Sequence, residues 1–94
     1  MTEKIFAIEY HYDLSRNSEI TEIRPEHRLF LRSLFDSEKL LASGPLGAEH
    51  ALIILRANTQ TEALEILNED PFQKAGLILH RNAKEWNPVI GPWN

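Results

Sequence analysis

The sequence predicts an α+β fold of the ferredoxin-like type, a four-stranded antiparallel sheet with two helices on one face. Three observations indicate it: an alternating segment at residues 4–12, two helical segments separated by a pair of short apolar runs, and a last apolar run at residues 77–86. The resulting order is β-α-β-β-α-β, and two helices separated by a hairpin most often fold in this way. Because the second sheet face stays uncovered in a monomer, we expect a homodimer that pairs through its sheet faces.

The first segment, "KIFAIEYHY" at residues 4–12, alternates strictly between its two sides. Phe6, Ile8, Tyr10 and Tyr12 point one way and Ile5, Ala7, Glu9 and His11 the other, which is typical of a strand. The following "DLSRNSEITEI", residues 13–23, is polar and turn-forming, and it predicts a loop.

A first helix of about three turns is predicted to begin near Pro25, because proline suits the first helical turn, where its missing N–H costs nothing. Leu31, Leu34 and Phe35 continue a stripe that starts at His27, at offsets of four, seven and eight residues. This spacing predicts one wide apolar face on the helix. An ionisable ring therefore stands where a core leucine is expected.

Two short apolar runs come next, "KLLASGPLG" at 39–47 and "HALIILRA" at 50–57, and they predict a hairpin with a loop around Pro45 to Glu49. A second helix follows over residues 58–70, where Thr59 and Glu62 form a capping box. Pro71 should end that helix, because the residue before a proline disfavours helical backbone. "LILHRNAKEW", residues 77–86, predicts the last strand.

The overall composition excludes several classes of function. The chain has 94 residues, the length of one domain (1–94), and its net charge of −4 without a Lys/Arg cluster argues against binding nucleic acid or anionic membranes. It lacks cysteine, so disulfides and thiolate metal sites are excluded. The charged start "MTEKIFAIEY" is unlike a signal peptide, and no apolar run approaches the roughly 20 residues of a membrane span. We expect a soluble, cytoplasmic protein.

His27 is the first candidate for chemistry. A histidine changes charge near physiological pH and can act as a general acid or base if a carboxylate orients it. Asp70, predicted at the C-terminal end of the second helix, could come close to it across the sheet face. A carboxylate there opposes the helix dipole, so a partner such as His27 or Arg24 would stabilise it. The alternatives are a hydrogen-bonded core histidine and plain helix-ending chemistry at "EDPF".

The remaining candidates are weaker by themselves. Ser43, Gly44 and Pro45 could line a pocket at a strand end or simply end the strand. His11, His50 and His80 show no zinc-binding spacing, and there is no G-x-S-x-G serine elbow or phosphate-binding loop, so no metal or cofactor is predicted. The simplest roles for Trp86 and Trp93 are core and dimer contacts.

Three segments together resemble the YCII (YciI-like) family, part of the dimeric α/β-barrel superfamily: "RPEHRLFLRSL", "KLLASGPLG" and "NEDPFQKAGL". The resemblance covers the chain from Ile5 to about Trp86, although the loop before the first helix is longer, and the hairpin shorter, than in many relatives. It implies a dimer joined sheet to sheet and a pocket centred on a histidine and an aspartate, which correspond to His27 and Asp70. Ser43, Gly44 and Pro45 correspond to the pocket lining.

The family resemblance also implies an activity. Members with a proposed role look like lyases or dehydrochlorinases that act on hydroxylated rings. We therefore expect a cofactor-free enzyme in which a His27–Asp70 pair transfers protons on a small substrate, with Arg24 available for an anionic group. A non-catalytic metabolite-binding dimer and a cofactorless oxygenase of the same superfamily remain alternatives.

Overall fold

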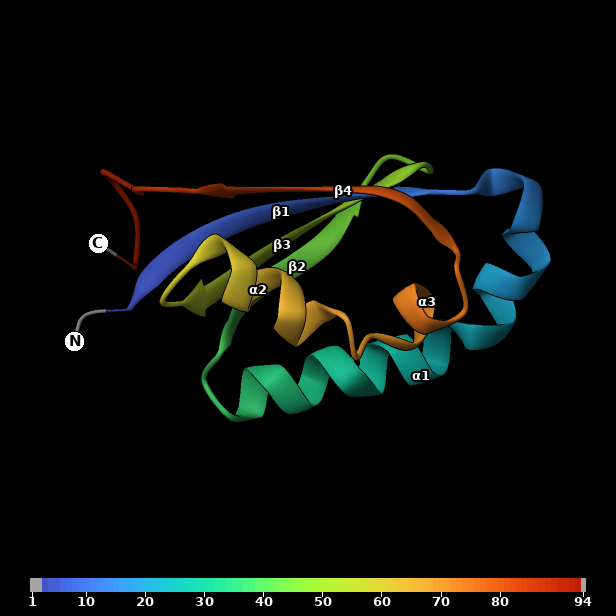
Figure 1. Cartoon of the computed structure of the whole chain (residues 1–94), viewed down its shortest axis with the longest axis horizontal. Helices are drawn as coiled ribbons and strands as arrows, with labels where there is room; N and C mark the ends of the chain where they lie inside the picture. Colours follow the sequence, from blue (N-terminus) through green and yellow to red (C-terminus); the bar gives the residue numbers. More distant parts are fainter. Residues whose placement is uncertain (1–2, 94) are drawn as a thin grey trace.

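The computed structural model describes residues 3–93. Its strands are β1 (Lys4–Tyr12), β2 (Leu40–Leu46), β3 (His50–Ala57) and β4 (Ile78–Glu85). The helical segments are a 3-10 turn η1 (Leu14–Arg16), α1 (Asn17–Asp36), α2 (Gln60–Leu67) and the short α3 (Pro71–Lys74). The strands form one antiparallel sheet in the order β2-β3-β1-β4, and the helices lie on one side of it (Figure 1). The predicted ferredoxin-like α+β fold is confirmed. No helix within residues 3–93 is long and apolar enough to cross a membrane.

The main core lies between the sheet and the helices, as the alternation of β1 predicts. Phe6, Ile8 and Tyr10 are almost completely buried, whereas their neighbours in β1 are partly exposed. Thr59 caps α2 by accepting a hydrogen bond from the backbone N–H of Glu62, as the capping box predicts. The main buried cluster contains Phe6, Ile8, Tyr10, Leu31, Leu40, Ala51, Ile53, Leu55, Ala57, Ala63, Leu67 and Ala83.

The helix α1 begins much earlier than the sequence predicts. It starts at Asn17, so most of residues 13–23 is helical rather than a loop, and Pro25 lies inside the helix. Ile20 is buried against Phe72 and Leu77 in a second small cluster, which gives this first part of α1 a packing partner. Phe35, predicted on the apolar stripe, is 47% exposed, because at 3.6 residues per turn it points about 80° away from His27.

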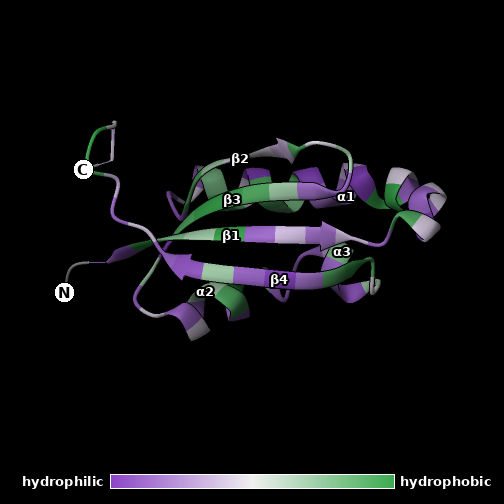
Figure 2. Ribbon diagram, turned by 90° about the horizontal axis from the view of Figure 1, so that it is seen from above, coloured by the Kyte–Doolittle hydropathy of each residue, from purple (hydrophilic) through white to green (hydrophobic). Residues whose placement is uncertain are grey.

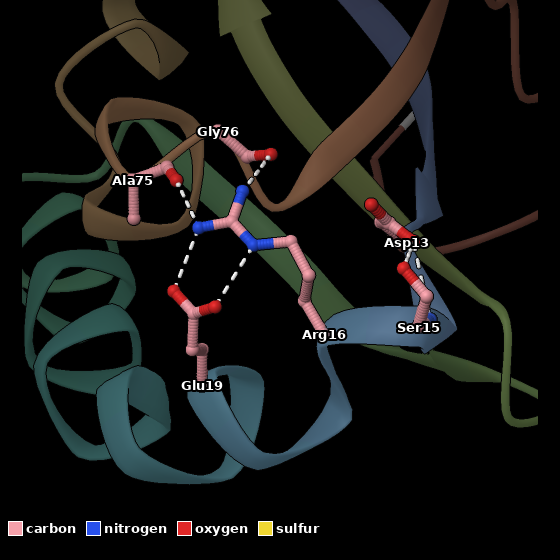
Figure 3. Close-up of polar contacts among 6 residues, drawn as sticks. All are labelled: Asp13, Ser15, Arg16, Glu19, Ala75 and Gly76. Atoms are coloured by element: carbon pink, nitrogen blue, oxygen red, sulfur yellow. Dashed lines mark hydrogen bonds and ion pairs between the residues drawn. The ribbon is translucent and has the colours of Figure 1, made fainter.

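Arg16 anchors the start of α1 to the segment that follows α3. Its guanidinium donates hydrogen bonds to the backbone carbonyls of Ala75 and Gly76, and it pairs with Glu19 at 2.6 Å (Figure 3). Asp13 adds a local turn by accepting hydrogen bonds from the backbone N–H and the hydroxyl of Ser15. These contacts fix the N-terminal part of α1 relative to α3.

The sheet face opposite the helices is uncovered, and Figure 2 looks onto it. We call it the open face; the register places on it Ala7, Glu9, His11, Ala42, Gly44, Leu46, His50, Leu52, Ile54, His80, Asn82 and Lys84. The His11 ring stands between those of His50 and His80, with centroid separations of 4.2 and 5.3 Å. Beside this row, a shallow hollow is bordered by Leu46 and Leu52 among others.

At the ends of the sheet the structure differs from two further predictions made from the sequence. Strand β2 extends through Leu46, so Pro45 pairs with Ala51 inside the strand and the turn comprises residues 47–49. An edge strand tolerates this proline because one of its N–H rows has no partner strand. Trp86 is 40% exposed and packs edge-on against Trp93 at 6.0 Å, so neither tryptophan belongs to the core.

Candidate active site

The buried carboxylate of Asp70 lies at the centre of the candidate site. Asp70 is completely buried, and it is the N-cap of α3 rather than the end of α2. Its Oδ1 accepts a hydrogen bond from the backbone N–H of Phe72 at 3.0 Å. The expected conflict with a helix dipole therefore does not exist, since an aspartate is a favourable residue at a helix N-cap.

His27 extends from α1 and meets this carboxylate directly. Its Nδ1 lies 2.8 Å from Oδ1 and 2.9 Å from Oδ2 of Asp70, and only 8% of the residue is exposed. The imidazole stacks on the ring of Phe72, with centroids 4.0 Å apart and planes 9° apart. The carboxylate and the aromatic ring thus fix both the position and the plane of the imidazole.

A third residue, Tyr10 of β1, completes the buried network. Its hydroxyl donates a hydrogen bond to Oδ2 of Asp70 at 2.9 Å. Burial, and then the nearby Asp70 carboxylate, raises the pKa of the Tyr10 phenol well above its ordinary value. Tyr10 therefore remains a neutral donor across the physiological pH range.

These contacts determine which ring nitrogen of His27 carries the proton. An ionised carboxylate only accepts hydrogen bonds, so Nδ1 must carry a hydrogen and donate it to Asp70. In the neutral imidazole Nε2 then has a free lone pair. Among the described residues, every buried side-chain nitrogen has a hydrogen-bond partner. Nε2 has no such partner among them, so it is not buried and must reach solvent. This geometry suits a base that takes and returns a proton.

Solvent reaches His27 through a cavity of about 500 Å³. The structure brings the candidate residues Arg24, Ser43, Gly44 and Pro45 to the wall of this cavity together with His27, whereas Asp70 lies behind the imidazole. Further lining residues that the sequence analysis did not single out for this site are Tyr12, Arg28, His50 and Phe72.

Tyr12 places a second phenol at this cavity. Burial first, and then the Asp70 carboxylate, raise the pKa of Tyr12 to about 12, whereas the Arg24 charge opposes the increase. The Tyr12 ring also packs edge-on against Phe72 at 5.5 Å. Tyr12 is therefore a neutral hydrogen-bonding group beside the His27–Asp70 pair.

A larger hollow of about 850 Å³ lies between α1 and the edge strand β2, next to Leu29, Arg32 and Phe35. It contains neither His27 nor Asp70 and offers no acid–base pair. By volume alone this hollow would be the candidate active site, but the smaller cavity is the one lined by His27, which pairs with Asp70. Within residues 3–93 no group of three histidine, aspartate or glutamate side chains is placed to hold a metal ion.

Sequence reasoning missed Tyr10 and Phe72, which contact the His27–Asp70 pair, as well as the cavity-lining residues Tyr12 and Arg28. The position of Tyr10 in the sequence could have identified it: it faces inward on β1, and a buried phenol needs a hydrogen-bond partner. The signal for Phe72 is weaker. Its neighbour Asp70 was identified, but the stack on His27 depends on how the turn after α2 folds.

Comparison with known proteins agrees with this fold. Residues 5–87 match the model of the YCII-related domain, so the chain belongs to the YCII family and the resemblance noted in the sequence is confirmed. No curated protein matches the chain significantly.

Solved structures that share the fold include the following two. One is 5-chloro-2-hydroxyhydroquinone dehydrochlorinase from Burkholderia phenoliruptrix in complex with 2,5-dihydroxybenzoquinone; it is 24% identical, with a TM-score of 0.76 over 88% of this chain and 93% of the dehydrochlorinase. The other, MtbAldR, is 10% identical with a TM-score of 0.58, over 99% of this chain and 59% of its own. At these identities the similarity shows a common fold.

Proposed function

We propose that this protein is a small-molecule enzyme of the lyase type, in which His27 and Asp70 transfer protons on a hydroxylated aromatic or enolic substrate. One observation carries the proposal: Nδ1 of His27 is held by a buried carboxylate while Nε2 reaches solvent beside a cavity. The dehydrochlorinase that shares this fold supports the lyase class and the hydroxylated ring.

A dehydrochlorination shows what such a dyad would do. Nε2 of His27 accepts the proton of a ring hydroxyl, and returning it to the carbon that bears chlorine gives a ketone tautomer. A second proton is then removed from a hydroxyl, and the electron pair of the C–Cl bond leaves with chloride. The substrate loses one proton and one chloride ion in total, so neither an oxidant nor a cofactor is required.

Each residue of the buried network has a distinct part in this proposal. Asp70 keeps the proton on Nδ1 of His27 and stabilises the imidazolium that forms when Nε2 accepts a proton. Tyr10 and Phe72 act through these two residues, by holding the carboxylate and the ring. Ser43, Gly44, Pro45 and Arg24 form the wall that the substrate contacts.

The proposal includes a homodimer joined through the open face, in the cytoplasm. In a 94-residue domain the hydrophobic core is small, and burying Leu46 and Leu52 against a second copy would add apolar contact.

Chloride release from 5-chloro-2-hydroxyhydroquinone tests the chemistry. His27→Asn is the informative variant, because an asparagine amide can still donate to Asp70 but cannot replace Nε2 as a base. We expect a loss of at least about 100-fold in rate, the range of general acid–base catalysis. Glu65→Gln, exposed on α2 and outside both the cavity and the open face, is the control and should keep full activity. If the compound binds but His27→Asn and the wild-type protein behave alike, the non-catalytic binding role is favoured.

A further inference from the structure

The charges around the cavity differ in sign from those of the chain as a whole. The protein has a formal net charge of −4, but the cavity wall contains Arg24 and Arg28 and neither an aspartate nor a glutamate. Asp70, completely buried behind His27, adds one negative charge that also acts on Tyr12 at the wall, but one carboxylate only partly offsets two guanidinium groups. The cavity is therefore an electropositive site on an acidic protein.

Neither guanidinium has an ion-pair or hydrogen-bond partner among residues 3–93. Arg16, by contrast, is held by Glu19 and two carbonyls. Arg24 and Arg28 are four residues apart on α1, so they lie on the same side of the helix and repel each other. An anion bound in the cavity next to both guanidinium groups would relieve this repulsion.

Arg24 also lies close to the proposed chemistry. Tyr12, Arg24 and His27 border the same cavity, and the Arg24 charge opposes the increase in the pKa of Tyr12. A carboxylate held by one or both arginines would gain charge-assisted hydrogen bonds in the paired geometry that guanidinium favours. The rest of the ligand would then extend along the wall toward Nε2 of His27.

We propose that the substrate carries a carboxylate, which Arg24 and Arg28 bind while the ring hydroxyl faces His27. This inference rests on the proposed function, since it assumes that the cavity holds the substrate. It narrows the substrate class from hydroxylated rings in general to hydroxylated aromatic or enolic acids, and it makes Arg24 and Arg28 determinants of specificity.

Binding of two matched probes tests the inference: 2,5-dihydroxybenzoate, which is an anion, and 2,5-dihydroxybenzamide, which is neutral and of similar shape. We expect calorimetry at neutral pH to show at least tenfold tighter binding of the benzoate. Combining Arg24→Gln with Arg28→Gln should lower its affinity to that of the amide. Arg32→Gln, one turn further along α1 and outside this cavity, is the control and should change the affinity less than twofold.

The outcomes separate this inference from the proposed function. Both the proposed function and the anion site hold if the His27→Asn variant loses turnover and still binds the benzoate tenfold more tightly than the amide. If the preference for the benzoate survives in His27→Asn and the wild-type protein turns over no hydroxylated ring, the anion site holds and the enzyme proposal fails. Equal affinities for the two probes, no binding of either, or an unchanged preference in the double arginine variant would overturn the anion site.

Discussion

Replacing Asp70 with asparagine removes one negative charge from the buried network and changes its shape little. The carboxylate accepts hydrogen bonds from Nδ1 of His27, the Tyr10 hydroxyl and the Phe72 N–H, and the residue is completely buried. A hydrogen bond to a charged group contributes about 1 kcal/mol more than a neutral one. Three such bonds give about 3 kcal/mol, and the lower cost of burying a neutral amide reduces the expected loss to about 2 kcal/mol.

Urea unfolding followed by far-UV circular dichroism measures this loss. For a domain of this size about 2 kcal/mol corresponds to a decrease in melting temperature of roughly 8–16 °C. Glu69→Gln is the matched control, because Glu69 precedes Asp70 and pairs with Lys74 at 3.1 Å on the surface. That exposed pair should contribute less than about 0.5 kcal/mol. If Asp70→Asn is as stable as Glu69→Gln, the buried network does not stabilise the fold and the reasoning is refuted.

Three further predictions concern pH, assembly and the hairpin. The pKa values of Tyr10 and Tyr12 are raised by folding, so the unfolded chain releases these protons first and stability should fall above pH 10, by up to about 1.4 kcal/mol per pH unit for each group. Tyr10→Phe should make this alkaline decrease, measured as the urea midpoint, shallower; an unchanged slope would contradict the assignment. If the proposed dimer forms through the open face, Leu52→Glu should give monomers in sedimentation equilibrium, whereas Leu29→Glu, on α1 and 71% exposed, should behave as the wild-type protein; a dimeric Leu52→Glu would contradict this interface. Gly47 has a φ of 72°, so Gly47→Ala should cost about 1 kcal/mol in thermal unfolding, and no loss would mean that the turn adapts.

The strands were predictable because their patterns match their surroundings. Strand β1 has one buried and one open face, so its apolar residues alternate, and "HALIILRA" coincides with the observed β3 (His50–Ala57). The capping box likewise marks the start of α2. In each of these segments the local pattern and the tertiary environment favour the same structure.

The start of α1 could not be placed from Pro25, because a proline usually occupies the first turn of a helix and is disfavoured in its interior, whereas Pro25 lies inside α1. The available signal was the spacing of Ile20, Ile23 and His27, which lie on one side of a helix. Ile20 and Ile23 contact Phe72 and the surrounding small cluster, a partner that is distant in sequence. The helix is thus stabilised by packing that a local pattern does not contain.

The candidate site was predictable in part. The sequence and the family resemblance identified His27 and Asp70, but the approach of Nδ1 to the carboxylate depends on α3 turning Asp70 inward as its N-cap. The unpaired guanidinium of Arg28 was missed because a sequence does not show which arginines lack partners. Pairing depends on side-chain positions, which only the folded chain defines.

The tautomer of His27 tests the account most directly. Long-range ¹H–¹⁵N spectra of the wild-type protein distinguish a proton on Nδ1 from one on Nε2 without any substrate. The account predicts that Nδ1 carries the proton and donates it to Asp70, and that Asp70→Asn moves the proton toward Nε2. A neutral His27 protonated on Nε2 in the wild-type protein would contradict the account, since the nitrogen that faces the cavity would then have no lone pair to act as a base.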